Sequence, residues 1–133
     1  MKLTEKKPLG KTGLTVPPII FGTSYLGNLY RALPYTDKLA LMKKWFECTE
    51  KPVVIDSAGK YGAGLALEMI GKGLGDLGIA PEDIIISNKL GWLRIPLKTE
   101  EPTFERGVWA DIENDALQTF SYEGIKKCYM RTI

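Results

Sequence analysis

Hydrophobic positions follow two patterns that alternate along the chain. Uninterrupted apolar runs cover 19–21, 53–55 and 84–86, and such runs predict strands that are buried on both faces, as in a parallel sheet. Apolar residues at helical spacing lie between them, in the segment that follows Thr36 and in 65–77. The order strand, helix, strand, helix, strand predicts an α/β fold with right-handed crossovers.

Turn and capping residues indicate where these strands and helices begin and end. Short extended pieces at Leu9 and 14–16 flank a turn with glycine at both ends, which predicts a small hairpin ahead of the first strand. Thr36 is a suitable N-cap for the first helix. Gly78 is a suitable C-terminal cap for the second helix.

The last part of the chain is less regular. Residues 90–120 show no clear period, which predicts a long irregular segment that serves as an active-site loop. A third helix is expected to begin near Ser121, with an apolar stripe of Ile125, Cys128 and Tyr129. The helical pattern continues to the last residue of the sequence without a glycine or proline that would end it. A closed (β/α)8 barrel needs about 250 residues. We therefore expect one partial domain over residues 1–133.

Composition narrows the class of protein. The 133 residues carry a net charge of +2, no histidine and two cysteines, which argues for one domain without a metal site or a disulfide scaffold. The small charge argues against a nucleic-acid binder, and no apolar run suits a membrane span or a secretory signal. We expect a cytoplasmic protein in which Cys48 and Cys128 are small buried apolar residues.

Three polar residues lie where the predicted strands end. Asp56 closes the second strand, Lys89 closes the third, and Tyr61 follows Asp56 by five residues. Because parallel strands place their carboxyl ends on one edge, Asp56 and Lys89 should reach each other as an ion pair. Such a pair can be purely structural. An ammonium beside a tyrosine, however, stabilises phenolate and equips the phenol to exchange a proton with a carbonyl or hydroxyl oxygen. The matching hydride would have to come from a cofactor.

Two glycine patterns invite a nucleotide-binding interpretation. Residues 73–78 satisfy G-x-G-x-x-G, but they follow a helix instead of a strand, so we do not expect a dinucleotide site there. Gly59, Gly62 and Gly64 follow a strand with the wrong spacing for that fingerprint. They are better explained as giving the loop room to place Tyr61.

Five short motifs occur in order over nearly the whole chain. They are Lys11-Thr12-Gly13-Leu14, Phe21-Gly22-Thr23, Asp56-Ser57-Ala58 with Tyr61-Gly62, Glu68 with Ile70-Gly71, and Ser87-Asn88-Lys89. In this order they resemble the aldo-keto reductase family. The stretch 21–27 and the segment from Lys89 to Trp109 resemble the branch of that family that contains D-threo-aldose 1-dehydrogenase, also called L-fucose dehydrogenase.

The resemblance implies a (β/α)8 TIM barrel with an N-terminal hairpin, of which this chain holds the N-terminal part, truncated after about three strands. It implies a catalytic tetrad whose aspartate, tyrosine and lysine match Asp56, Tyr61 and Lys89. The tetrad histidine follows a fourth strand that this sequence does not contain. Gly22, Thr23 and Asp56 are implied at the nicotinamide side of the cleft, with NAD or NADP as cofactor.

The resemblance also implies a function. We expect NAD(P)-dependent oxidation of an aldose at C1 to a lactone, or the reverse carbonyl reduction, with a sugar or other small carbonyl compound as substrate. Tyr25, Trp92 and Trp109 are candidates for the wall of the sugar pocket, with Trp92 favoured because it lies just after Lys89. The alternative for the tryptophans is hydrophobic cover of the barrel rim.

Two other functions remain open at this point. The chain could be a non-catalytic half-barrel that binds another chain or associates with itself through open sheet edges. It could also be a small nucleotide-binding domain that uses the loop 59–64. The isolated 133 residues are expected to be inactive as an enzyme.

Overall fold

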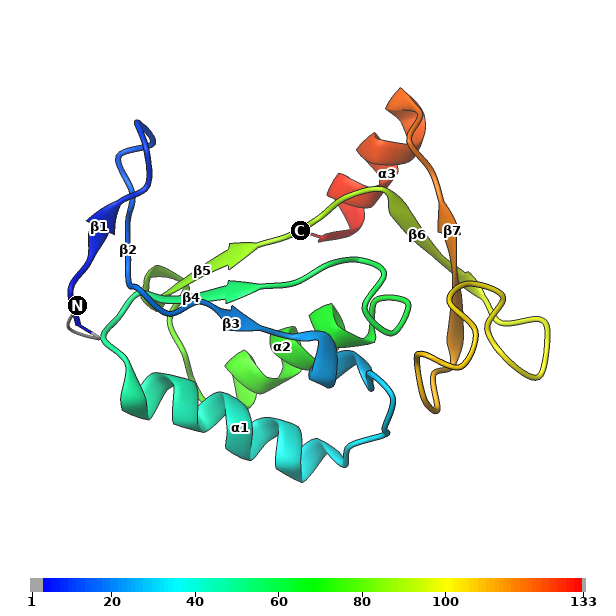
Figure 1. Ribbon diagram of the computed structural model, residues 1–133, viewed down its shortest axis with the longest axis horizontal. Helices are drawn as coiled ribbons and strands as arrows, with labels where there is room; N and C mark the ends of the chain where they lie inside the picture. The colour runs from blue at the N-terminus through cyan, green and yellow to red at the C-terminus, as the bar shows by residue number, and fades with distance from the viewer. Residues whose placement is uncertain (1–3, 133) are drawn as a thin grey trace.

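A three-stranded parallel sheet lies at the centre of the computed structural model, which describes residues 4–132 (Figure 1). Its strands are β3 (Phe21–Gly22), β4 (Val53–Asp56) and β5 (Ile84–Ser87), in that spatial order. Gly22 pairs with Asp56, and Asp56 pairs with Ser87. The carboxyl ends of the strands therefore meet at one edge, as the sequence predicts.

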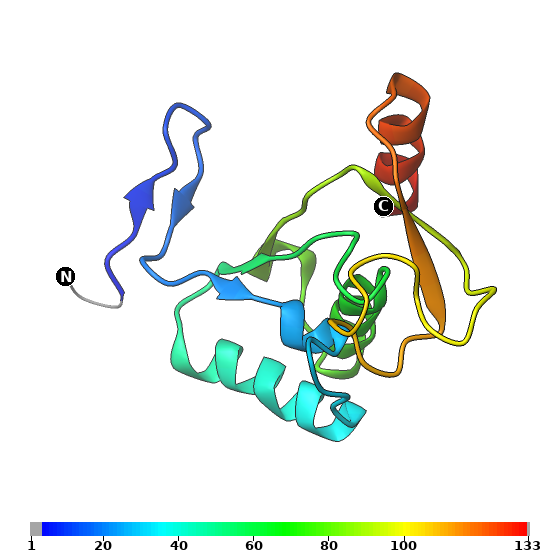
Figure 2. The same ribbon diagram turned by 45° about the vertical axis from the view of Figure 1, so that its right-hand side comes forward.

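Two helices cover one face of this sheet. They are α1 (Tyr35–Cys48) and α2 (Leu65–Asp76), and Figures 1 and 2 show both on the same side of the strands. The main core lies between these layers, with Phe21 stacked on Trp45 at 5.1 Å between ring centroids. The buried residues of this core are Leu26, Met42, Trp45, Val53, Ile55, Ala66 and Ile70.

The predicted hairpin is present at the start of the chain. Strands β1 (Lys7–Pro8) and β2 (Thr15–Val16) pair antiparallel. The hairpin stands apart from the helices at the end of the sheet where β3, β4 and β5 begin (Figures 1 and 2). Two 3-10 turns complete this half of the chain: η1 (Ser24–Gly27) follows β3, and η2 (Pro81–Asp83) precedes β5.

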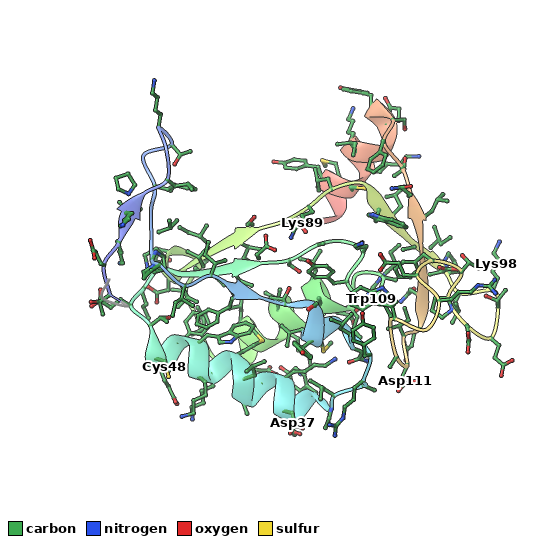
Figure 3. All side chains as sticks on the ribbon, in the orientation of Figure 1. Asp37, Cys48, Lys89, Lys98, Trp109 and Asp111 are labelled. Atoms are coloured by element: carbon green, nitrogen blue, oxygen red, sulfur yellow. The ribbon has the colours of Figure 1, made fainter. Side chains whose placement is uncertain are left out.

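Several local expectations were wrong. Ile20 is 51% exposed and Ile86 is 42% exposed, because the first and third runs form or flank outer strands that pair only with β4 among the described residues. Thr36 is not the N-cap, since α1 begins one residue earlier, after Pro34. Cys48 is exposed at the end of α1 (Figure 3), whereas Cys128 is buried as expected.

Residues 90–120 are not irregular throughout, contrary to the expectation. Strands β6 (Trp92–Pro96) and β7 (Asn114–Gln118) pair antiparallel over their full length and enclose the loop 97–113. The loop itself is held by Asp115, whose carboxylate accepts hydrogen bonds from the backbone and hydroxyl of Thr103. The long segment is therefore a hairpin with an anchored loop.

The third helix, α3 (Tyr122–Thr132), packs beside β6. Ser121 caps it as predicted, because its hydroxyl accepts a hydrogen bond from the Gly124 amide at 3.0 Å. Cys128 of the expected apolar stripe faces the hairpin and donates to the Trp92 carbonyl, whereas Tyr129 of the same stripe is exposed. Within the described residues, no helix combines the length and the apolar character needed to cross a bilayer.

Candidate functional site

Asp56 and Lys89 form the predicted ion pair at the carboxyl edge of the sheet. The Lys89 ammonium donates to the Asp56 carboxylate and also to the Ser57 carbonyl, the latter at 3.0 Å. Figure 3 shows Lys89 beyond the end of β5, on the side of the sheet toward the β6–β7 hairpin. The backbone supports this arrangement, because the Ser57 amide donates to the Ser87 carbonyl at 2.8 Å.

Tyr61 reaches the same place from the loop between β4 and α2. The Lys89 Nζ atom lies 5.3 Å from the centroid of the Tyr61 ring. Three consecutive residues after Tyr61 have positive φ, at 62° for Gly62, 53° for Ala63 and 90° for Gly64. This turn bends the chain sharply into α2, so that Tyr61 faces the end of the sheet. The three side chains that the sequence predicts to converge therefore do so.

Charge at this site favours the protonated form of Lys89. Burial lowers the pKa of Lys89, but the hydrogen bond to Asp56 and the negative charge available on Tyr61 and Asp56 outweigh it, so the pKa lies above its ordinary value. Lys89 thus stays an ammonium across the neutral range. Its side chain is 52% exposed, which leaves the charge accessible to a small polar molecule.

The loop 59–64 makes close contacts at two of its glycines. A Cβ on Gly62 would lie 2.4 Å from the Gly27 carbonyl oxygen, and one on Gly64 would lie 3.0 Å from Arg94. Arg94 also donates to the Ala63 carbonyl at 2.7 Å and pairs with Glu68 at 2.8 Å. Gly62 thus serves a close backbone contact with η1, while Gly59 and Gly64 line a cavity beside β6.

A second hydrophobic cluster surrounds Tyr61 and is built largely by the hairpin loop. The Trp109 ring packs against the Tyr61 ring, with 5.7 Å between centroids. The loop is tied to the segment after β3 by backbone hydrogen bonds from Tyr30 to Val108 and from Ala110 to Asn28. The buried members of the cluster are Ala63, Phe104, Trp109, Ile112 and Ala116.

The three candidate sugar-wall residues lie in different surroundings. Tyr25 is 60% exposed on η1, and Trp109 is only 7% exposed against Tyr61. The Trp92 ring packs against the Phe104 ring in a tilted arrangement and lines a cavity of about 420 Å³ together with Glu68, Arg94 and other residues. Asp56, Tyr61 and Lys89 are not among the lining residues of that cavity. Trp109, not Trp92, is thus the tryptophan in contact with Tyr61.

Three residues near the site received no role in the sequence analysis. Lys60 and Glu105 form an ion pair at 2.6 Å beside Tyr61, and Ser57 is fully buried with its hydroxyl oxygen unpaired within the described residues. Ser57 belongs to the motif Asp56-Ser57-Ala58, and Lys60 immediately precedes Tyr61 of the same motif, so the sequence pointed to this part of the chain. Nothing in the local pattern marks Glu105, because its partners come from other segments.

A family comparison decides the lineage. The sequence model of the Aldo/keto reductase family matches residues 18–129 of this chain. The chain belongs to the aldo/keto reductase family.

Two curated relatives show how much of such a protein the chain represents. Pyridoxal 4-dehydrogenase of Microbacterium luteolum is 28% identical over 97% of this chain and 39% of its own length. L-galactose dehydrogenase of Arabidopsis thaliana is 33% identical over 68% of this chain and 28% of its own length. The chain therefore spans less than two fifths of the relatives it matches.

Solved structures give the same result for the fold. An aldo-keto reductase of Bacillus halodurans in its holo form superposes with a TM-score of 0.66, at 24% identity, over 97% of this chain and 35% of that one. The glycerol dehydrogenase of Gluconobacter oxydans superposes with a TM-score of 0.64, at 15% identity, over 96% of this chain and 34% of that one. The expected fold is confirmed: the chain is the N-terminal part of an aldo/keto reductase barrel.

In this aldo/keto reductase chain, the end of β3 leaves open space beside the ion pair. Gly22 pairs with Asp56, and no atom lies within 4 Å of a Cβ built on it, so the space beside Asp56 is open. Thr23 is 1% exposed, and its hydroxyl donates to the Asp56 carbonyl at 3.0 Å. Gly22 thus leaves room at this edge, while Thr23 fixes the end of β4.

Proposed function

We propose that a polypeptide carrying this chain with the remaining strands of the barrel is an NAD- or NADP-dependent dehydrogenase. It oxidises an aldose at C1 to the lactone or performs the reverse carbonyl reduction. The observation that carries this proposal is the convergence of Asp56, Lys89 and Tyr61 at one edge of the sheet. The names of the two curated relatives, both dehydrogenases of small molecules, support it.

The chemistry assigned to this chain is the transfer of one proton between Tyr61 and the substrate oxygen. In the oxidative direction, the Tyr61 oxygen takes the proton of the C1 hydroxyl as hydride leaves C1. The Lys89 ammonium stabilises the tyrosinate form, and Asp56 holds Lys89 in place and in its charged state. In the reductive direction, Tyr61 returns the proton to the carbonyl oxygen. Nicotinamide, when bound, supplies the hydride chemistry that no side chain can supply.

Binding roles are assigned by position. Gly22 and Asp56 would line the nicotinamide side, with Thr23 holding the strand end behind them. Tyr25 has the exposed ring that a sugar could stack against, and Trp92 is a second candidate wall. We place the protein in the cytoplasm, where Cys48 and Cys128 would remain free thiols.

The test is turnover by the complete polypeptide. Aldoses including L-galactose, and separately pyridoxal, are offered with NAD and with NADP, and the reduced nicotinamide is followed by its absorbance. The proposal predicts lactone formation from at least one aldose with one of the two cofactors. A folded protein that binds either cofactor but turns over no aldose and reduces no carbonyl compound would contradict it.

A second candidate function follows from the open sheet edges. Strands β3 and β5 pair only with β4 among the described residues, and Ile20 and Ile86 are exposed there. A half-barrel of this kind could act without catalysis by binding another chain or a second copy. Size-exclusion chromatography of residues 1–133 separates the two: a defined oligomer with a cooperative melt favours the binding module, and an aggregated or molten species favours a truncated enzyme.

A further inference from the structure

Glu105 connects two segments that meet beside Tyr61. One carboxylate oxygen binds the Lys60 ammonium at 2.6 Å, and the other accepts a hydrogen bond from the Trp109 indole nitrogen at 2.8 Å. Lys60 immediately precedes Tyr61, and the Trp109 ring lies against the Tyr61 ring. The carboxylate thus holds both the backbone neighbour of Tyr61 and the ring that covers it.

The backbone of Glu105 supports a specific role. Its φ is +41°, in the left-handed region that a glutamate rarely adopts. Such a conformation persists only where surrounding contacts hold it. Here the contacts are those of the carboxylate to Lys60 and Trp109, together with a backbone hydrogen bond from the Val108 amide to the Glu105 carbonyl at 3.1 Å. The pKa of Glu105 is consistent with these contacts. Burial raises the pKa, but the hydrogen bonds from Lys60 and Trp109 lower it by more, so the group is a carboxylate at neutral pH.

Stability alone gives a weak account of this arrangement. The Lys60 and Glu105 side chains are 35% and 33% exposed, and exposed ion pairs contribute little to stability. The hydrogen bond to Trp109 differs, because the indole is 7% exposed and a buried N–H requires an acceptor. That contact fixes the orientation of the ring against Tyr61.

We propose that Glu105 is a positioning residue that acts through Trp109 to hold the Tyr61 phenol in line with Lys89. This role rests on the proposed function, because it assigns the carboxylate to the reaction step and not to substrate binding. Loss of Glu105 should therefore lower kcat and leave KM nearly unchanged. If Trp109 instead served as a wall of the sugar pocket, KM would rise and kcat would stay the same.

The experiment compares four variants of the complete polypeptide. Glu105→Leu removes both contacts, Glu105→Gln keeps an oxygen for the Trp109 N–H but loses the charge toward Lys60, and Lys60→Met leaves the Trp109 contact intact. Glu113→Leu, at an exposed glutamate of the same loop, is the matched control. Each variant is assayed for kcat and KM. The emission of Trp109 is obtained as the difference between each spectrum and that of the same protein with Trp109→Phe.

We expect Glu105→Leu to lower kcat by about 10- to 100-fold with little change in KM and to shift the Trp109 emission to the red. Glu105→Gln should recover most of both readouts, and Glu113→Leu should match the wild type. If Glu105→Leu does not fold, Glu105→Gln and Lys60→Met replace it, and Lys60→Met should then have the smaller change in Trp109 emission because it leaves the indole contact intact.

Two results in Glu105→Leu would overturn the role of Glu105: a raised KM at constant kcat, or an unchanged Trp109 emission. If Glu105→Leu does not fold, a raised KM at constant kcat in Glu105→Gln would overturn it. A wild-type protein without oxidoreductase activity would refute the proposed function instead. In that case the emission readout alone decides whether Glu105 orients Trp109.

Discussion

Lys89 and Asp56 meet as an ion pair at the ends of adjacent parallel strands, although 33 residues separate them in the sequence. This contact depends on the sheet topology, because only parallel neighbours place both carboxyl ends on the same edge. Tyr61 arrives beside the pair from the loop after β4. The parallel pairing of β4 with β5 and the tight turn after Tyr61 therefore bring together the residues of the candidate proton-transfer site.

The first prediction concerns the pH dependence of activity. Burial lowers the pKa of Lys89, and Asp56 and Tyr61 together raise it above the ordinary lysine value. Replacing Asp56 with asparagine removes the largest raising influence, so Lys89 should lose its proton at a lower pH. We expect the alkaline limb of the kcat profile to move to lower pH in Asp56→Asn, measured on the complete polypeptide.

The control for that profile is Asp37→Asn, at an exposed aspartate in the first turn of α1. It changes the net charge by the same amount at a distance from the site. An identical shift in both variants would attribute the effect to overall charge and not to the Asp56 contact.

A second prediction concerns the turn that places Tyr61. Gly62 has a φ of 62°, and a Cβ there would lie 2.4 Å from the Gly27 carbonyl oxygen. Because the obstacle is backbone, Gly62→Ala should destabilise the fold by about 3 kcal/mol or more. Gly71, in α2, has no atom within 4 Å of a built Cβ, so Gly71→Ala should stabilise it by about 0.5–1 kcal/mol.

Denaturant unfolding of both glycine variants measures this contrast. Equal effects of the two substitutions would show that the close approach between Gly27 and Gly62 is absent from the folded protein.

A third prediction concerns stability at acid pH. Burial raises the pKa of Asp115, but hydrogen bonds from Thr103 and from backbone amides, including that of Ala116, lower it more, so the pKa lies below the ordinary aspartate value. A carboxyl group with a lowered pKa in the folded state stabilises the fold above its unfolded-state pKa. That contribution is lost as the pH falls through the folded-state value.

Asp115→Asn should therefore lower stability at neutral pH by about 1–3 kcal/mol and flatten its fall in acid. Urea unfolding as a function of pH measures both effects. Asp111→Asn, at an exposed residue of the same loop, should leave the pH dependence unchanged. A wild-type acid limb in Asp115→Asn would assign the acid sensitivity to other carboxylates.

The order of elements and the ion pair could be predicted because both depend on local patterns. Apolar runs locate the strands, helical spacing locates α1 and α2, and parallel order then brings Asp56 to Lys89. Burial at the edges could not be predicted in this way. Ile20 and Ile86 belong to runs typical of central strands, but they lie on or beside outer strands and are exposed.

The β6–β7 hairpin was missed for a different reason. Proline ends β6, while asparagine and aspartate begin β7, and these residues are poor markers of a strand. Pairing across the loop 97–113 is a long-range contact with no local signal. The same holds for Trp109 against Tyr61 and for Glu105, whose importance depends entirely on what the loop meets in space.

Tyr61→Phe is the most direct test of the account, because it removes one hydroxyl oxygen and keeps the ring that packs against Trp109. The rate of aldose oxidation by the complete polypeptide is compared with that of Tyr122→Phe, which removes the hydroxyl of an exposed tyrosine at the start of α3. The account predicts a loss of at least about 100-fold for Tyr61→Phe and a near wild-type rate for Tyr122→Phe. A near wild-type rate in Tyr61→Phe would contradict the assignment of proton transfer to this site.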